Sequence, residues 1–265
     1  MKKKHAGKSS APLRLIYGVN PVIESLRADR IPSEIIIAAG ARDARLRDLV
    51  ELARTKDVTI KQAPRAVLDR EAGNTHHQGV VARLAQASYA DAGDLLESIT
   101  EKIGTANEPL TLLLDGIEDP RNLGAVLRTA ECAGVDGVFI PERRAAGLNE
   151  TVAKASAGAS EHLPIARVTN LSLLIRQLKE RNLWIVGTSA DAAVDYTGWD
   201  WTRPSAIVLG AEGSGLHRLV REHCDALVKI PVRGKIQSLN VSVAAGIILY
   251  EVLRQRVAAK QNSEP

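Results

Sequence analysis

The sequence contains little cysteine and few aromatic residues, and both shortages exclude classes of protein. Only Cys132 and Cys224 occur in 265 residues, far apart and without a CxxC pair or histidines at metal-ligand spacing. Neither a disulfide framework nor a zinc site is indicated, no metal is expected, and both cysteines are predicted to be buried free thiols in a reducing compartment. Aromatic residues make up 3% of the chain, which argues against recognition of single-stranded nucleic acid by bases stacked on exposed rings.

Long apolar runs are also missing. No stretch of signal-peptide or membrane-spanning length follows the basic start of the chain. The sequence therefore predicts a protein that has no contact with a membrane and stays in the cytoplasm.

The body of the chain lacks an excess of charge of one sign. The formal net charge is +4, and four lysines near the start account for all of it, so the remainder is balanced. Residues 1–12 are expected to form a flexible basic arm, which either grips phosphates or, like many such tails, binds nothing acidic. The four residues are Lys2, Lys3, Lys4 and Lys8.

The chain does contain the alternation of strand and helix that is typical of α/β proteins. Its length suits two domains. We expect a small α/β domain over 13–84, a linker over 85–108, where apolar periodicity weakens, and a larger domain over 109–265. In the larger domain short apolar runs alternate with helical stretches, which predicts a mostly parallel sheet covered on both faces.

Strands of the small domain are expected at 34–38, 58–61 and 79–84. Helices are expected at 16–27, at 44–54 and from residue 64, with another short one over 91–103 in the linker. In the first helix Asn20 is predicted to cap and Pro21 to take the first helical position.

The first segment that carries chemistry spans residues 114–134, LDGIEDPRNLGAVLRTAECAG. A strand is expected to end at Asp115 and a helix to begin near Asn122, and α/β sheets bind ligands where strand ends face helix starts. Arg128 follows Asn122 by nearly two helical turns, so its side chain could reach back into the same pocket. Local physics alone favours a plainer interpretation, in which Asn122 is a cap and Arg128 a surface charge.

The second segment spans residues 206–216, AIVLGAEGSGL, where a buried strand breaks into a glycine-rich loop around one carboxylate, Glu212. Such glycines let the backbone approach a ligand and suit an adenosine or a phosphate, although a tight turn would need them too. No third glycine follows Gly213 and Gly215 where the dinucleotide pattern GxGxxG requires one. A nicotinamide-dependent enzyme is therefore only a weak alternative.

The third segment spans residues 229–255, KIPVRGKIQSLNVSVAAGIILYEVLRQ. A strand ending at Ile230 leads through a basic loop to Ser238 and Leu239, and Asn240 lies at the cap of a long helix. Alone, this is an ordinary helix start. Three strand ends that all carry polar residues favour one shared pocket.

These three segments closely resemble, in order and separation, the signature motifs of the TrmH-like branch of the SPOUT RNA methyltransferases. The motifs are NLGAVLRTAECAG, VLGAEGSGL and IPVRGKIQSLNVSVAAGI, and the resemblance covers about residues 110–258. It is specific because several uncommon positions must coincide across one domain. More weakly, IYGVNPVIESL and NTHHQGVVA are similar to the amino-terminal domain of the RlmB group, bacterial guanosine 2'-O-methyltransferases of 23S ribosomal RNA.

The resemblance implies an α/β fold in which the carboxy-terminal domain is a SPOUT knot, a parallel sheet with a deep trefoil knot, among the rare exceptions to unknotted topology. It implies that the methyl donor S-adenosylmethionine binds bent in the knot and that two knot domains form a homodimer. The implied cofactor contacts, made mainly by backbone atoms, are Gly210, Ile230 and Leu239, with Leu209 nearby.

The resemblance also implies a catalytic set, and none of its members is replaced in this chain. Arg128 would contact the target phosphate and help to remove the proton of the ribose hydroxyl, and the others would shape the site. Because a guanidinium holds its proton with a pKa above ~12, we expect Arg128 to anchor the phosphate while a phosphate oxygen or water accepts the proton. The set is Arg128, Asn122, Glu212, Ser238 and Asn240.

For residues 13–84 the resemblance implies an L30e-like RNA-binding fold. The two adjacent histidines of this region are as easily interpreted as surface residues. The candidate RNA contacts are Asn20, Arg65, His76, His77 and Gln78.

The activity expected is therefore 2'-O-ribose methylation of RNA, with a guanosine of 23S ribosomal RNA favoured because the transfer RNA members of the branch rely on terminal extensions instead of such a domain. A transfer RNA guanosine methyltransferase and a non-catalytic RNA-binding ribosome-assembly protein are the alternatives. The sequence does not fix the target nucleotide.

Overall fold

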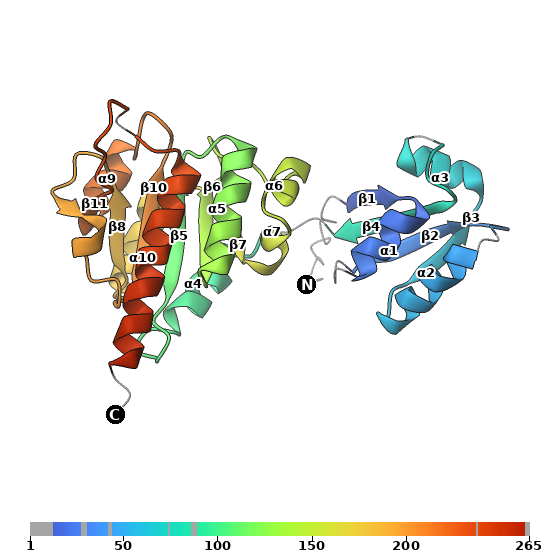
Figure 1. Ribbon diagram of the computed structural model, residues 1–265, viewed down its shortest axis with the longest axis horizontal. Coiled ribbons are helices and arrows are strands. Elements are labelled where there is room, and N and C mark those ends of the chain that lie inside the picture. Colours follow the sequence, from blue (N-terminus) through green and yellow to red (C-terminus); the bar gives the residue numbers. More distant parts are fainter. Residues whose placement is uncertain are drawn as a thin grey trace, which may run out of the picture. The chain divides into compact units, whose positions relative to one another are not determined.

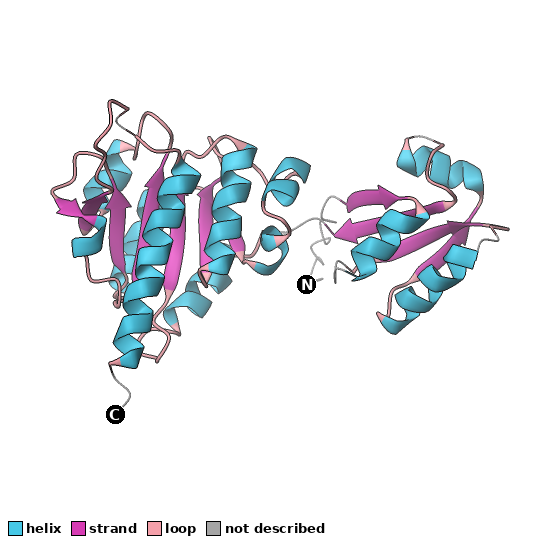
Figure 2. Ribbon diagram, viewed as in Figure 1, coloured by secondary structure: helices cyan, strands magenta, loops and turns pink. Residues whose placement is uncertain are grey.

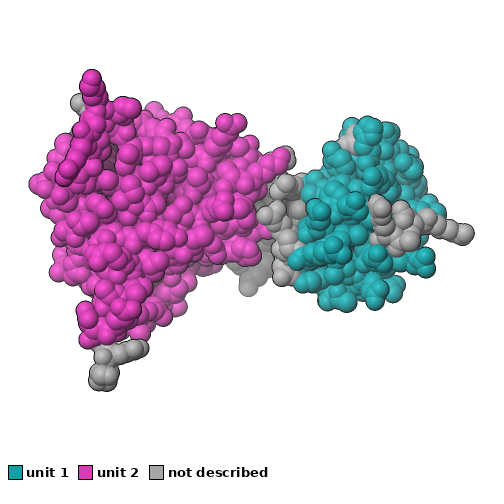
Figure 3. Space-filling model, viewed as in Figure 1, with its two compact units in different colours: residues 1–88 teal, residues 89–265 magenta. Residues whose placement is uncertain are grey.

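The computed structural model describes residues 13–27, 31–41, 44–73, 75–85, 89–236 and 238–262. The chain divides into two compact units, residues 1–88 and 89–265 (Figure 3). The expected basic arm of residues 1–12 lies outside the described residues.

The amino-terminal unit is a four-stranded sheet in the order β1-β4-β2-β3, with helices between the strands. Strand β4 pairs antiparallel with β1 and β2, and β2 pairs parallel with β3. Every residue of the central strand β2 is buried, because both faces of the sheet are covered. The elements are β1 (Leu13–Tyr17), α1 (Val19–Arg27), β2 (Glu34–Ala38), α2 (Ala44–Thr55), β3 (Ile60–Ala63), α3 (Arg65–Ala72) and β4 (Val80–Ala85).

The start of this unit differs from the sequence-based prediction of one helix over 16–27. Residues up to Tyr17 form β1, and Gly18 turns the chain with φ of +97° before α1 begins at Val19. Asn20 therefore lies inside the helix and does not cap it, and Pro21 is not its first residue.

His77 is fully buried and has a structural role. Its Nδ1 accepts the backbone N–H of Gly79 at 3.0 Å, so Nε2 carries the proton and donates to Asp69 at 2.8 Å. A side chain so enclosed does not face RNA. The other amino-terminal candidates, Asn20, Arg65, His76 and Gln78, are exposed.

The carboxy-terminal unit is a seven-stranded sheet in the order β7-β6-β5-β10-β8-β11-β9, and all of its strand pairs are parallel. This confirms the predicted α/β fold with a parallel sheet. The elements are α4 (Ala92–Thr100), β5 (Leu110–Asp115), α5 (Pro120–Cys132), β6 (Gly137–Pro141), α6 (Glu150–Ala155), α7 (Ala159–His162), β7 (Ile165–Val168), α8 (Leu171–Glu180), β8 (Trp184–Thr188), β9 (Val194–Asp195), the 3-10 helix η1 (Tyr196–Gly198), β10 (Ser205–Gly210), α9 (Arg218–His223), β11 (Ala226–Lys229) and α10 (Val241–Gln261).

Helices cover both faces of this sheet (Figure 2). Alternate residues of β5 point to opposite sides, so Leu112 and Leu114 pack against α5 and α10 while Leu113 packs against α4 and α8. Figure 1 shows α5 and α10 side by side on one face and α4 on the other. The chain leaves β5 outward to β6 and β7 and returns on the other side to β8 and β10, so the order reverses between β5 and β10. Ligands of open α/β sheets bind at such a reversal, at the carboxyl ends of the strands.

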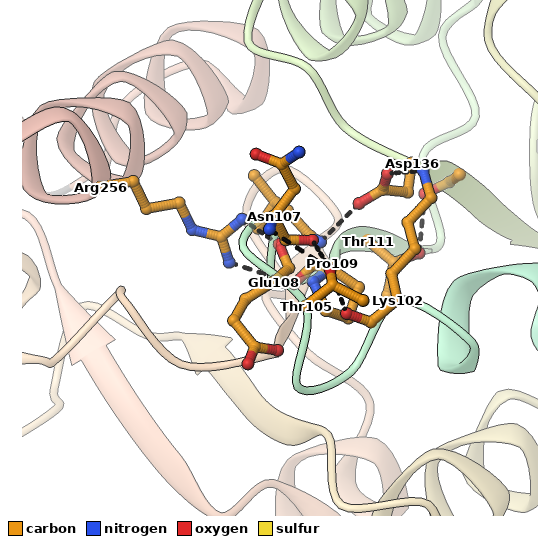
Figure 4. Close-up of polar contacts among 10 residues, drawn as sticks. Lys102, Thr105, Asn107, Glu108, Pro109, Thr111, Asp136 and Arg256 are labelled. Atoms are coloured by element: carbon orange, nitrogen blue, oxygen red, sulfur yellow. Dashed lines mark hydrogen bonds and ion pairs between the residues drawn. The ribbon is translucent and has the colours of Figure 1, made fainter. Parts of the chain in front are cut away.

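Arg256 connects α10 to the edge of the sheet at which the strands begin, opposite the edge formed by their carboxyl ends (Figure 4). Its guanidinium donates hydrogen bonds to the carbonyl oxygens of four residues that precede β5 and β10. Burial lowers the pKa of Arg256, yet a guanidinium remains protonated and suits a cluster of carbonyl acceptors. The four residues are Trp201, Glu108, Pro109 and Arg203.

Two expectations differ from the structure of this unit. Helix α4, within the expected linker 85–108, belongs to the carboxy-terminal unit because Leu95 and Ile99 are buried against its sheet. Cys132 is exposed at the end of α5, whereas Cys224 is half-buried. Within the described residues no helix is long and apolar enough to cross a membrane.

Candidate active site

The carboxyl ends of β5 and β10 carry the centre of the site. Asp115 and Gly210 end these neighbouring strands in register. Helix α5 follows β5 on one face of the sheet and α9 follows β10 on the other, which leaves a crevice between the two strand ends.

The loop after β10 is a tight turn that raises Glu212 above the sheet. Ala211 and Gly215 exchange two backbone hydrogen bonds of 3.0 and 3.1 Å. Gly213 and Gly215 have φ of +81° and +67°, a region that favours glycine. A Cβ on Gly210 would lie 2.3–2.5 Å from backbone atoms of residues 215 and 216, so this position has no room for a side chain.

Asn240 caps α10 and reaches Glu212 with the other end of its amide. Its Oδ1 accepts the backbone N–H of Ser242 at 2.9 Å, which directs Nδ2 toward the loop. Nδ2 then donates to Glu212 Oε1 at 2.7 Å and to Asn122 Oδ1 at 3.0 Å. The predicted cap at Asn240 is confirmed.

Asn122 completes a triangle with these two residues. The cap of α5 is Asp119, whose side chain accepts the N–H of Arg121 at 2.8 Å, and Pro120 opens the helix. Asn122, predicted as a possible cap, is thus free to donate from Nδ2 to Glu212 Oε1 at 2.8 Å. The structure brings together three predicted residues from the three separate motifs, 118 positions apart at most.

Glu212 Oε1 accepts hydrogen bonds from both amides, and the N–H of Val241 adds a longer contact of 3.4 Å. For Oε2 of Glu212 the described residues offer no hydrogen-bond partner. One carboxylate oxygen is therefore fixed by the protein and the other is open to a substrate.

A cavity of about 330 Å³ lies beside this triangle. It contains all four predicted cofactor contacts, Leu209, Gly210, Ile230 and Leu239, together with the predicted Ser238. A second cavity of about 340 Å³ lies on the side of β5. Ala211, Glu212, Ser214 and Val241 line both cavities and so form the wall between them.

Arg128 does not join the triangle. It is exposed on α5, about 9 Å farther along the helix axis than Asn122. Within the described part of the chain its guanidinium has no hydrogen bond or ion pair, so it is available to a partner from outside.

The contacts of Arg221 with Ser189 and Asp191 in the wall of the first cavity were not predicted from the sequence. After β8, Ser189 and Asp191 line the cavity, and Arg221 of α9 donates to Ser189 Oγ at 2.6 Å and to both oxygens of Asp191. The hydrogen bond from Ser189 and the nearby Arg221 lower the pKa of Asp191. Only the end of the apolar run LWIVGT marked this strand end, and nothing in the sequence linked it to Arg221.

A second missed feature is the contact of Asp115 with His217. Buried Asp115 accepts the backbone N–H of His217 at 2.8 Å and lies 2.9 Å from its Nδ1. This contact fixes the start of α9 against the end of β5. It joins residues 102 positions apart.

Other reactive groups do not converge here. Burial raises the pKa of the Cys224 thiol to about 12, which keeps it protonated and poorly nucleophilic. Among the described residues no group of three or more His, Cys, Asp or Glu side chains could hold a metal ion.

Residues 109–250, more than half of the chain, match the SpoU rRNA Methylase family. The chain belongs to this family. Residues 15–90 of this SpoU-family chain match a second family, described as RNA 2'-O ribose methyltransferase substrate binding. The chain is 46% identical over 241 residues to YacO of Bacillus subtilis strain 168, named as a TrmH family tRNA/rRNA methyltransferase, and the match covers 91% of this chain and 95% of the relative.

Solved structures agree with this SpoU-family assignment. The SpoU methyltransferase AviRb from Streptomyces viridochromogenes, in complex with AdoMet, has a TM-score of 0.67 at 25% identity and covers 93% of this chain and 91% of its own. A structure described as an RNA 2'-O ribose methyltransferase has a TM-score of 0.60 at 27% identity, with 94% and 91% covered. This SpoU-family protein is an S-adenosylmethionine-dependent RNA 2'-O-ribose methyltransferase, as the motifs predicted, and the nicotinamide-dependent and non-catalytic alternatives are wrong.

The first cavity suits the cofactor of this SpoU-family enzyme. Its volume lies at the lower end of the roughly 300–1,000 Å³ of small-molecule sites. Apolar side chains such as Leu209 and Ile248 can pack on an adenine, and the tight backbone at Gly210 can approach it closely. Asp191, also on the lining, carries a carboxylate that can accept hydrogen bonds from ribose hydroxyls or from the ammonium of the methionine part.

Proposed function

We propose that this enzyme methylates the 2'-hydroxyl of a guanosine in 23S ribosomal RNA, in the cytoplasm where ribosomes are assembled. Asn122, Glu212 and Asn240 form a triangle on the wall between two cavities, and this arrangement supports the proposal. The first cavity holds the cofactor and the second receives the ribose. The separate amino-terminal unit, of the kind found in RNA 2'-O ribose methyltransferases, supports a large structured RNA as substrate.

When bound in the first cavity, S-adenosylmethionine supplies a strongly electrophilic methyl group. Gly210, Ile230 and Leu239 hold it through backbone atoms, with Leu209 beneath. The chain's own task is to place the weak ribose nucleophile in line with that methyl group and to exclude other orientations.

Glu212 orients the ribose. Its Oε1 is fully engaged by the two asparagine amides, which hold the carboxylate in one rotamer. Its open Oε2 accepts a hydrogen bond from a ribose hydroxyl. Ser238 lines the first cavity and shapes the site on the side of the cofactor.

Arg128 anchors the phosphate next to the target ribose. Its unpaired guanidinium can grip a phosphate with two parallel hydrogen bonds. The positive charge also stabilises the oxyanion that develops when the hydroxyl loses its proton, and a phosphate oxygen or water accepts that proton.

The enzyme acts as a homodimer through its carboxy-terminal unit. Helix α10 buries one side in the core and exposes an apolar stripe on the other, in which Tyr250 and Val243 are 52% and 51% exposed. Such a stripe suits a two-fold contact with a second copy. We further propose that the segment 230–240, which brings Asn240 against the loop after β10, completes the trefoil knot.

Incubating the protein with methyl-labelled S-adenosylmethionine and total bacterial RNA tests the target. The expected result is label in one guanosine of 23S ribosomal RNA whose 3' phosphodiester resists alkali, because a methylated 2'-oxygen cannot attack it. Label in transfer RNA alone would contradict the 23S assignment.

A further inference from the structure

The loop between β6 and α6, residues 142–149, is short and firmly attached. Its residue Ala146 is buried, and the N–H of Ala146 donates to the carbonyl of Ile117 at 2.8 Å. Farther on, the N–H of Leu148 donates to the hydroxyl of Tyr89 at 2.9 Å. The loop backbone therefore has a fixed position on the carboxy-terminal unit.

Two arginines form the exposed tip of this loop. Arg143 and Arg144 are both exposed, and within the described residues neither guanidinium has a hydrogen bond or an ion pair. Arg144 has φ of +55°, which is uncommon for any residue except glycine and asparagine.

The tip lies on the substrate side of the proposed active site. Ile117, to which the loop is bonded, lines the second cavity together with Asn122 and Glu212. Helix α6, which follows the loop, packs tightly on α5. The two arginines therefore belong to a loop that is bonded to the lining of the second cavity.

We infer that Arg143 and Arg144 bind phosphates of the RNA strand next to the target nucleotide, an inference that rests on the proposed function. Unpaired, exposed guanidiniums on a fixed backbone suit phosphate oxygens. Contacts with the RNA backbone set the register of the strand, whereas the triangle at Glu212 selects the ribose within it.

Binding of full-length protein to 23S ribosomal RNA transcribed in vitro, measured over a range of NaCl concentrations, tests this inference. Each phosphate contact contributes about 0.7–0.9 to the slope of log affinity against log salt. The variant R143S/R144S should reduce that slope by about 1.4–1.8 and weaken binding roughly tenfold at moderate salt. Its affinity for S-adenosylmethionine should be unchanged, because neither residue lines the first cavity.

Two further variants separate RNA binding from other effects. R144G should keep or raise the thermal midpoint, since glycine suits the left-handed backbone, while it lowers the slope by about 0.7–0.9. The control R176S/R181S removes two positive charges, one from α8 and one from the residue that follows it, and should leave the slope near that of the wild type.

A slope of R143S/R144S equal to that of the wild type, an equal loss in the α8 control, or absence of binding by the wild type would each overturn the inference. Methyl transfer by the wild type to 23S ribosomal RNA, measured in parallel, reports on the proposed function separately. Retained methylation with an unchanged slope would refute the role of the loop alone.

Discussion

At the scale of single residues, the two oxygens of Glu212 have different surroundings. Oε1 accepts from both asparagine amides and Oε2 is open. Glu212→Gln keeps the size of the side chain and one carbonyl oxygen for the amides, but turns the open acceptor into a donor. We predict that the rate of methyl transfer in single turnovers falls about 100-fold, while the affinity for S-adenosylmethionine changes little.

The matched control is Glu222→Gln, which breaks only an exposed ion pair with Arg218 on α9. Its transfer rate should equal that of the wild type. A Glu212→Gln enzyme that is as fast as this control would contradict the role of the open oxygen.

Motif spacing predicted the triangle residues but not their contacts. Asn122, Glu212 and Asn240 each follow a strand end, and parallel strands bring such positions to one edge of the sheet. The contact between Arg221 and Asp191 joins residues 30 positions apart, and the contact between Asp115 and His217 joins residues 102 positions apart. Partners of that kind depend on the order of the strands, which periodicity does not reveal.

At the scale of elements, Arg256 connects α10 to the starts of β5 and β10. Arg256→Met would keep most of the apolar stem but leave four carbonyl groups without their donor. We predict a loss of about 2–5 kcal/mol in the unfolding free energy of the carboxy-terminal unit, measured by urea denaturation. Arg218→Met on the surface of α9 should cost far less, and equal losses for the two variants would contradict the fastening role.

Most strands and helices of the amino-terminal unit could be predicted to within two residues, because their apolar runs are bounded by turn residues. Strand β1 could not. Its residues Leu13–Tyr17 continue into a helical pattern, and it is a strand because its residues pair with β4 residues 64–72 positions later. Helix α5 begins two residues earlier than predicted because Asp119 is a better cap for a helix that opens with Pro120.

At the scale of the whole molecule, the exposed stripe of α10 is the basis for the proposed dimer. The double variant Tyr250→Glu with Leu253→Glu puts two charges on that stripe, whose burial against a second copy would then be unfavourable. We predict a monomer by size-exclusion chromatography with light scattering, where the wild type is a dimer. Leu173→Glu, on the exposed side of α8, should remain a dimer, and dimers in all three proteins would contradict this interface.

The sequence predicted two units, but it could not locate the boundary between them. The residues of α4 show weak periodicity, yet Leu95, Leu96 and Ile99 are buried against Phe139 and other residues of the larger sheet. This packing against residues 40 or more positions later assigns α4 to the carboxy-terminal unit, and no local sequence pattern indicates it.

In the proposed mechanism the site positions an RNA phosphate and its ribose, and the variant Arg128→Lys separates this positioning from simple charge. The measurement is single-turnover methyl transfer to saturating 23S ribosomal RNA, with RNA affinity determined in parallel. Lysine retains the charge but not the two parallel hydrogen bonds, so we predict that RNA binding persists while the transfer rate falls by about 100-fold or more. A transfer rate equal to that of the wild type would contradict this mechanism.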